Sequence, residues 1–145
     1  MAYKGRFKPV NYKKYKGDPT NIVYRSLWER KAMQYFDTND NVIEWSSEET
    51  VIPYYDPVQG KWRRYFPDFV IKAKKSDGTT IVKMLEVKPS KETKEPKKQK
   101  RITRKYITEV TTWGTNQAKW KAAHEYCLDR GWEFQLITEK ELGIK

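Results

Sequence analysis

One stretch, residues 65–89, constrains this 145-residue chain more than any other. A typical turn sequence at 76–78 separates two runs rich in aromatic and β-branched residues, which predicts a β-hairpin. An antiparallel hairpin brings the start of its first strand beside the end of its second, so Asp68 is expected next to Glu86 and Lys88. Because strand side chains alternate, Glu86 and Lys88 share a face. The sequence therefore predicts two carboxylates and an ammonium group at one edge of a small sheet.

These three side chains match the needs of metal-assisted phosphodiester hydrolysis. That reaction uses hard oxygen ligands for Mg²⁺, a positive charge near the developing negative charge, and an open coordination position. Asp68, Glu86 and Lys88 can supply the ligands and the charge. The same pattern also occurs on a solvated strand face that carries a surface ion pair. The hairpin alone leaves both interpretations open.

A first helix is predicted over residues 21–37, with its strongest periodicity between 26 and 36. The predicted apolar arc of this helix consists of Trp28, Ala32, Met33, Tyr35 and Phe36. Glu29 falls inside that arc, where a carboxylate is costly unless it is paired or bound to a metal. Glu29 either forms an ion pair with Arg25, one turn earlier, or reaches the hairpin site as a third acidic ligand, directly or through water.

Two further strands are predicted before the hairpin's second half. The first covers residues 50–55, and the second opens at residues 61–64 and contains Asp68. Arg63 and Arg64 are placed to meet phosphate beside the site, or else they form an exposed basic strand end. Glu48 and Glu49 are interpreted as surface charges, with a site role as the lesser alternative.

Charge points to a polyanionic partner. The chain has 30 Lys and Arg against 19 Asp and Glu, a net charge of +11. Residues 1–20 form a basic arm that either touches phosphates or is a loosely ordered terminus. Residues 88–105 carry a second basic run, which is either a solvated loop or, as we favour, a DNA-guiding surface. The expected DNA contacts are Arg63, Arg64, Lys97, Lys98, Lys100, Arg101, Arg104, Lys105, Asn116 and Lys119.

A second clear helix is predicted over residues 115–130, ended by Gly131, and a last strand over 132–138. The predicted buried arc of the helix is Trp120, Ala123, His124, Cys127 and Leu128, with Asn116 at its edge. His124 is interpreted as a packed residue rather than a ligand. The single cysteine excludes an internal disulfide and a cysteine-based zinc site, which indicates a reducing, intracellular setting, and no apolar run reaches membrane-spanning length.

The predicted order is helix, three strands, basic segment, helix, strand. Together with the helical Glu29, the Pro67-Asp68 pair and Glu86-Val87-Lys88, this αβββαβ order resembles the PD-(D/E)xK nuclease superfamily over roughly residues 21–140. The resemblance implies an α/β fold: a single restriction-endonuclease-like domain, with a small mixed sheet flanked by helices. We expect this domain to span residues 21–145, including the basic segment 89–112.

More specifically, the chain resembles the head-completion nucleases of T-even-type tailed bacteriophages, through residues 15–19, 24–29, 63–68 and 116–123. It is more distantly similar to the endonuclease subunit of heteromeric transposases. The closer resemblance implies a DNA endonuclease that uses Mg²⁺, with Mn²⁺ as a substitute, and acts at the end of DNA packaging. Its implied partners are DNA and phage portal or head-completion proteins, with no membrane. Its implied locations are the host cytoplasm during assembly and the head-to-tail joint of the virion.

The resemblance also implies roles for the site residues. Asp68 and Glu86 hold the metal together with the Val87 carbonyl, and Lys88 positions water and stabilises negative charge on the scissile phosphate. Glu29 orders a second metal or its water. Two other functions stay open: a catalytically silent DNA- or portal-binding structural protein of the phage neck, and a basic RNA-binding module in which the acidic residues form ordinary ion pairs.

Overall fold

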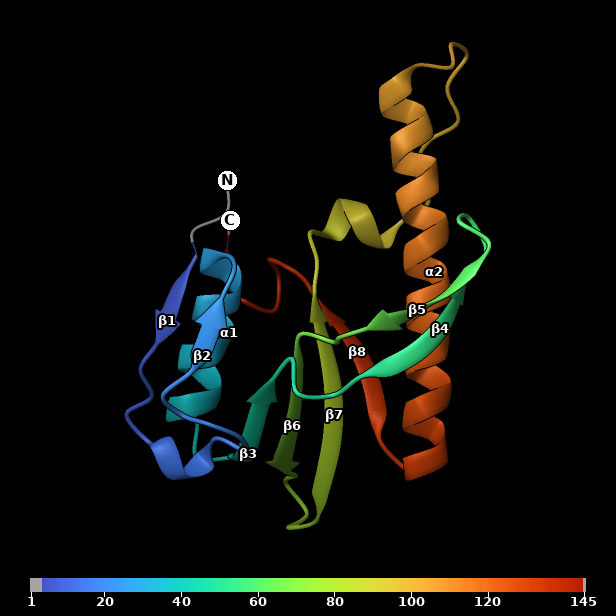
Figure 1. Ribbon diagram of the computed structural model, residues 1–145. Coiled ribbons are helices and arrows are strands. Elements are labelled where there is room, and N and C mark those ends of the chain that lie inside the picture. The colour runs from blue at the N-terminus through green and yellow to red at the C-terminus, as the bar shows by residue number, and fades with distance from the viewer. Residues whose placement is uncertain (1–3, 145) are drawn as a thin grey trace.

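A four-stranded mixed sheet forms the centre of the protein. The computed structural model describes residues 4–144 (Figure 1). The strand order in the sheet is β3-β6-β7-β8, in which only the β7–β8 pair is parallel. The strands are β3 (Val42–Ser47), β6 (Phe69–Lys74), β7 (Thr80–Val87) and β8 (Glu133–Ile137). The predicted hairpin is therefore the β6–β7 pair.

Two helices complete the central unit, α1 (Leu27–Thr38) and α2 (Arg104–Arg130). Along the chain, α1, β3, β6, β7, α2 and β8 form an αβββαβ order, but its first strand is β3 rather than the strand predicted at residues 50–55, and a separate hairpin is inserted between β3 and β6. The crossover from β7 to the parallel strand β8 runs through α2, as a parallel connection requires. The expected α/β fold with a small mixed sheet is confirmed.

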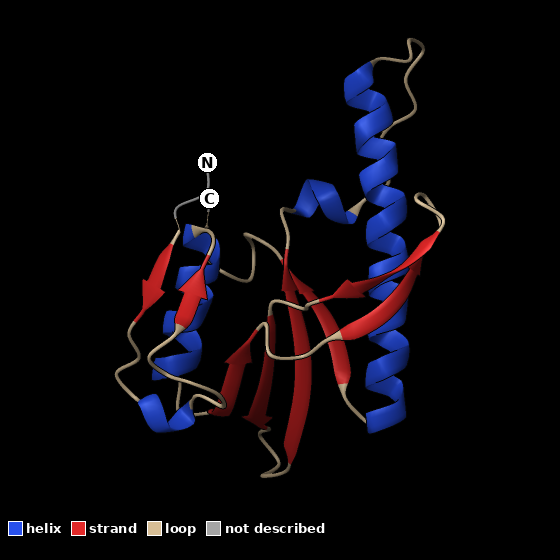
Figure 2. Ribbon diagram, viewed as in Figure 1, coloured by secondary structure: helices blue, strands red, loops and turns tan. Residues whose placement is uncertain are grey.

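The two helices pack on opposite faces of the sheet because strand side chains alternate. On β7, Leu85 joins a core with Phe36 of α1 and with Trp45, whereas its neighbour Met84 joins a second core with Cys127 of α2. Figure 2 shows the helices on either side of the strands. The polar residues at the ends of the strands thus lie between two well-packed layers.

A separate hairpin, β4 (Ile52–Asp56) and β5 (Lys61–Tyr65), lies along α2 and does not join the central sheet. The strand predicted at residues 50–55 therefore exists, but it pairs only with β5. The prediction that Asp68 lies within the strand that begins at residue 61 was wrong, since β5 ends before Pro67 and β6 begins after Asp68.

Strand β3, at one edge of the central sheet, was not predicted from the sequence. Its last residues, Ser46 and Ser47, are buried polar residues, so the run lacks a regular alternation of apolar and polar side chains. The strand forms because it pairs with β6 and buries the Trp45 indole. Neither contact is local in sequence.

Asp56 fastens the β4–β5 hairpin to α2. Its carboxylate is fully buried and accepts hydrogen bonds from the Val58 N–H at 2.9 Å and from the Thr115 hydroxyl at 3.4 Å. It also forms an ion pair with Arg63 at 3.4 Å. Gly114 lets the hairpin approach closely, because a Cβ there would lie 3.2 Å from the Val58 side chain. The hairpin is held as part of the α2 layer.

The N-terminal segment packs on the body of the protein. Strands β1 (Gly5–Phe7) and β2 (Ile22–Tyr24) pair, and the 3-10 turn η1 (Tyr12–Lys14) lies between them. Phe7 and Tyr15 are buried with their rings edge-on to Trp45. Residues 1–3 of the predicted arm lie outside the described residues. The prediction that the first helix starts at residue 21 was wrong, because residues 22–24 pair as a strand and Ser26 caps α1.

Helix α2 is longer than predicted, since it runs without a break from residue 104. Its end was predicted correctly: Gly131 caps it with a φ of 70°, a conformation that glycine adopts without strain. The predicted buried arc was wrong at His124 and Leu128, which are exposed, while Asn116 is buried. The remaining element is the turn η2 (Ser90–Thr93), and none of the helices in residues 4–144 is both long and apolar enough to cross a membrane.

Candidate active site at the strand ends

The β6–β7 register places Asp68 opposite Glu86. Phe69 pairs with Leu85, so the next pair outward is Asp68 and Glu86. The Asp68 N–H donates to Glu86 Oε1 at 3.2 Å, and the Val87 N–H donates to Asp68 Oδ2 at 2.8 Å. The predicted proximity of the two carboxylates in the hairpin is confirmed.

Glu48 reaches the same place from the other side of β6. Ser47, the last residue of β3, pairs with Phe69, and the Glu48 N–H then donates to the Asp68 carbonyl at 3.1 Å. Glu48 has a φ of 54°, a left-handed conformation that costs energy for any residue other than glycine. Its carboxylate also forms a two-point ion pair with Arg25, with both N···O distances at 3.1 Å.

Glu29 approaches from the first turn of α1. The Ser26 hydroxyl accepts a hydrogen bond from the Glu29 N–H and donates one to Glu29 Oε2, both at 3.2 Å. Carboxylate oxygens of Glu29, Glu48 and Asp68 lie within 4.8 Å of one another. The proposed Arg25–Glu29 ion pair is therefore replaced by an Arg25–Glu48 pair, and Glu29 faces the other carboxylates.

Glu86 borders this group on the α2 side of the sheet. It is 7% exposed, and the positive charges of Lys88 and Lys119 act on it. The Lys119 ammonium lies 5.7 Å from the centre of the Tyr65 ring, which is also buried beside Glu86. The site thus has a carboxylate side built from three strand ends and α1, and a cationic side built from Lys88 and α2.

Crowding of carboxylates in a buried place shifts their protonation. Burial, followed by the charges of Glu86 and Glu29, raises the pKa of Asp68 well above its ordinary value. Burial also raises the pKa of Glu86 and of Glu29, although Lys88 opposes the shift at Glu86 and the Ser26 hydroxyl opposes it at Glu29. Burial lowers the pKa of Lys119. A cation placed among the carboxylates would relieve their repulsion.

The donor set fits a hard divalent metal ion. Mg²⁺ holds oxygen ligands at about 2.1 Å, so neighbouring ligand oxygens around it lie about 3 Å apart. The carboxylate oxygens of Glu29, Glu48 and Asp68 converge to within 4.8 Å of one another, a separation that rotation of the side chains would have to reduce for all three to bind one ion. All three are carboxylates, the ligand type that Mg²⁺ and Mn²⁺ prefer.

Comparison with known proteins agrees with this geometry. Residues 39–139 match the family model described as "TnsA-like endonuclease N terminal". The chain is also 42% identical to the head completion nuclease of Enterobacteria phage T4, in an alignment that covers 100% of this chain and 99% of that protein. The chain belongs to the TnsA-like endonuclease family.

In this TnsA-like endonuclease, the predicted DNA-contacting residues occupy different settings. Arg63 and Arg64 are exposed on β5, where Arg63 pairs with Asp56 and Arg64 lies over the Phe66 ring. The basic residues of the segment before α2 and of its first turn are exposed: Lys97, Lys98, Lys100, Arg101, Arg104 and Lys105. Lys119 is half-buried beside Glu86, and Asn116 is buried one turn earlier on α2.

Sequence reasoning undervalued Glu48 and did not consider Tyr65 for the site. Glu48 was interpreted mainly as a surface charge because the strand that precedes it was missed. The available signal was the position of Glu48 directly after a run that ends in Trp45-Ser46-Ser47, where a strand would end beside Asp68. Tyr65 carried no signal, since a tyrosine at the end of a strand is most often a packing residue.

Proposed function

We propose that this TnsA-like endonuclease is a Mg²⁺-dependent DNA endonuclease that acts in phage head completion after DNA packaging. Mn²⁺ is expected to substitute. The proposed partners are DNA and phage portal or head-completion proteins, and the proposed places of action are the host cytoplasm during assembly and the head-to-tail joint of the virion. The 42% identity to the T4 head completion nuclease, over the whole length of both chains, supports the biological setting.

One observation carries the catalytic part of the proposal. Three adjacent strands and α1 bring four carboxylates, those of Glu29, Glu48, Asp68 and Glu86, to one edge of the sheet. Each is buried or half-buried, and desolvation raises the pKa of Glu29, Asp68 and Glu86. Clusters of mutually repelling carboxylates with raised pKa values occur mainly at functional sites. Binding of a divalent cation is the function that fits this set of oxygen ligands.

In the proposed mechanism, Asp68, Glu86 and the Val87 carbonyl would hold the metal, with Glu29 on the α1 side and Glu48 next to Asp68. When bound, Mg²⁺ acts as a Lewis acid toward the phosphate and lowers the pKa of water. The Val87 N–H and the Glu48 N–H hold Asp68 in place. Lys88 orients water and stabilises the charge on the scissile phosphate, and Lys119 places a second cation beside Glu86.

The test is cleavage of linear duplex, single-stranded and branched DNA with Mg²⁺ or Mn²⁺. Asp68→Asn and Lys88→Ala should each reduce cleavage at least a hundredfold while DNA binding is retained. Matched controls exist on the same hairpin: Asp77→Asn lies in the far turn, and Lys83→Ala lies on the opposite face of β7. Both controls should cleave like the parent.

Two results would contradict the proposal. If no DNA is cut with either metal and the Asp68→Asn protein still assembles into heads, the protein is a structural component of the neck. If RNA displaces DNA and no metal binds, the protein is a basic RNA-binding module. Calorimetric titration with Mn²⁺ separates both from an enzyme, because only an assembled carboxylate site binds the ion and loses it in Asp68→Asn.

A further inference from the structure

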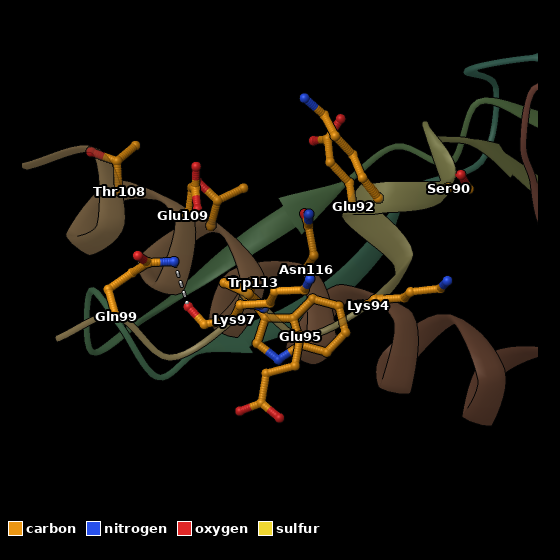
Figure 3. Close-up of a pocket in the computed structure, with 13 residues that line it drawn as sticks. Ser90, Glu92, Lys94, Glu95, Lys97, Gln99, Thr108, Glu109, Trp113 and Asn116 are labelled. Carbon is orange, nitrogen blue, oxygen red and sulfur yellow. Dashed lines mark hydrogen bonds between the residues drawn. The ribbon is translucent and has the colours of Figure 1, made fainter.

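A cavity of about 780 Å³ opens beside the candidate active site, between residues 90–99 and the N-terminal half of α2 (Figure 3). Ser90, at one end of its lining, follows Lys88 by two residues. Asn116, at the other end, lies one helical turn before Lys119. The cavity therefore lies next to the cationic side of the site, within a few residues of Lys88 along the chain and within one turn of Lys119 on α2.

Asn116 supplies a buried polar group that faces this cavity. The residue as a whole is 5% exposed, and its side-chain amide lines the cavity and is not among the sealed, unpartnered polar atoms of residues 4–144. An amide that is open to a cavity offers both hydrogen-bond donors and an acceptor to a molecule bound there. A ligand with both hydrogen-bond donors and acceptors at its edge would satisfy it.

Trp113 supplies a flat apolar surface in the same wall. It lies one turn before Asn116 on α2, lines the cavity, and contacts Trp120 edge to face at 6.3 Å between ring centres. The contact with Trp120 holds the indole in place, so a ring that stacks on it adds little ordering cost. Stacking on a fixed aromatic side chain is how proteins hold single nucleobases.

The charge of the lining favours a base over a phosphate. Six charged residues line the cavity, three of each sign: Lys91, Lys94, Lys97, Glu92, Glu95 and Glu109. A phosphate would be repelled by the three carboxylates, whereas the polar edge of a base can donate to carboxylates and accept from ammonium groups. The exposed lysines and arginines of residues 98–105, outside the cavity, remain available to the backbone phosphates.

We propose that this cavity holds one unpaired nucleobase of the strand being cut, stacked on Trp113 and hydrogen-bonded by Asn116. The base must be unpaired, because its hydrogen-bonding edge and its face are both used by the protein. The preferred substrate is then DNA with a single-stranded or frayed nucleotide next to the scissile phosphate. This inference rests on the proposed nuclease function.

An abasic scan with the intact protein tests the proposal. Nucleotides of a single-stranded oligonucleotide are replaced one at a time by an abasic residue. Binding is measured by fluorescence anisotropy in EDTA, and the cut position is mapped separately with Mg²⁺. One position at a constant offset from the cut should weaken binding about tenfold, which is within the range for loss of one stacked base. Neighbouring positions should change binding less than twofold.

Protein variants assign the effect to the cavity. Trp113→Leu should abolish the position-specific loss, while Trp113→Phe, which keeps a ring, should retain it. Trp62→Leu is the matched control, because Trp62 is 70% exposed on β5 and does not line this cavity. If Trp113→Leu does not fold, the scan with the intact protein and with Asn116→Leu decides the question.

The outcomes separate this proposal from the nuclease proposal. If metal-dependent cleavage is observed and no abasic position stands out, the cavity does not hold a base and the nuclease function stands. If a position stands out in binding, the effect is lost in Trp113→Leu and no DNA is ever cut, the base site stands and the nuclease function fails. Equal cleavage of blunt duplex and frayed DNA would also overturn the base site.

Discussion

Asp68 occupies the least favourable electrostatic position among the residues of the site. It is half-buried among Glu86, Glu48 and Glu29, and its pKa is raised by desolvation first and by the charges of Glu86 and Glu29 second. A raised pKa means that the folded protein binds the proton more tightly than the unfolded chain does. The ionised form therefore destabilises the metal-free fold, and this destabilisation appears as pH rises through the interval between the ordinary and the raised pKa.

This predicts that Asp68→Asn stabilises the metal-free protein. At pH 8 in EDTA, the melting temperature should rise by about 3 °C or more, the shift that ~1 kcal/mol produces in a chain of this size. Near pH 4 the gain should disappear, because the parent carboxyl is then protonated. Circular dichroism melts at both pH values measure the effect. Asp77→Asn is the control: hydrogen bonds from Thr79 lower the pKa of Asp77, so no gain is expected there.

Glu48 is the residue whose role differs most between sequence and structure. We predict that Glu48→Gln weakens binding of Mn²⁺ about tenfold in calorimetric titration, because it removes one of the three converging carboxylates. Glu49→Gln is a matched control, since Glu49 is exposed and accepts a hydrogen bond from the Tyr15 hydroxyl. Equal titrations for both variants and the parent would assign Glu48 to the Arg25 ion pair alone.

At the scale of elements, the start of α1 links helix stability to the site. Ser26 is the N-cap of α1 and also donates a hydrogen bond to the Glu29 carboxylate. Thr103 caps α2 in the same way, through a hydrogen bond from the Tyr106 N–H at 3.1 Å, but it is exposed. Both residues therefore cap a helix through the same hydrogen bond, but only Ser26 also contacts a carboxylate of the site.

Substitution of the two caps should separate an effect on folding stability from an effect on cleavage and metal binding. Ser26→Ala and Thr103→Ala should each lower the free energy of unfolding by about 1 kcal/mol, the usual cost of losing a cap, in urea titrations. Only Ser26→Ala should also lower cleavage and metal affinity, because Glu29 loses the group that orients it. If Thr103→Ala impairs metal binding as strongly, the effect of Ser26→Ala is one of general stability.

For the whole molecule, basic residues are distributed along the length of the fold. The β6–β7 turn lies at one end, and the segment that precedes α2 lies at the other, beyond the site (Figure 1). Both ends carry exposed lysines, among them Lys74 and Lys75 in the first and Lys98 and Lys100 in the second. A net charge of +11 alone attracts DNA without orienting it.

DNA binding should depend on which end is neutralised. Lys98→Ala/Lys100→Ala should reduce the slope of log Kobs against log salt by about two, because each phosphate contact contributes about one to the slope. Lys74→Ala/Lys75→Ala should leave the slope unchanged within experimental error. Titrations at several salt concentrations with the Asp68→Asn background measure this. Equal effects of the two double variants would mean that net charge, rather than the 88–105 segment, binds DNA.

Much of the fold was accessible from the sequence, but unevenly. The pairing within the β6–β7 hairpin and the end of α2 at Gly131 follow from signals within a few residues of one another. The buried face of α2 was predicted only in part, because a single helical stripe does not reveal that Asn116 would be buried while Leu128 is 63% exposed. The catalytic roles of Glu29, Asp68, Glu86 and Lys88 stay predictions.

The sequence by itself determined that Asp68 and Glu86 would meet, because one short turn and the alternation of strand side chains set the pairing of the hairpin. Tertiary structure alone decided that Glu48 would join them, since β3 finds β6 across more than twenty residues through burial of Trp45. It also decided the cavity at Trp113 and Asn116, where α2 extends past the sheet and residues 90–99 fold over it. Turn and strand patterns depend on residues that are close in sequence. The contacts of β3 and α2 instead depend on burial of apolar surface between segments that are distant in sequence.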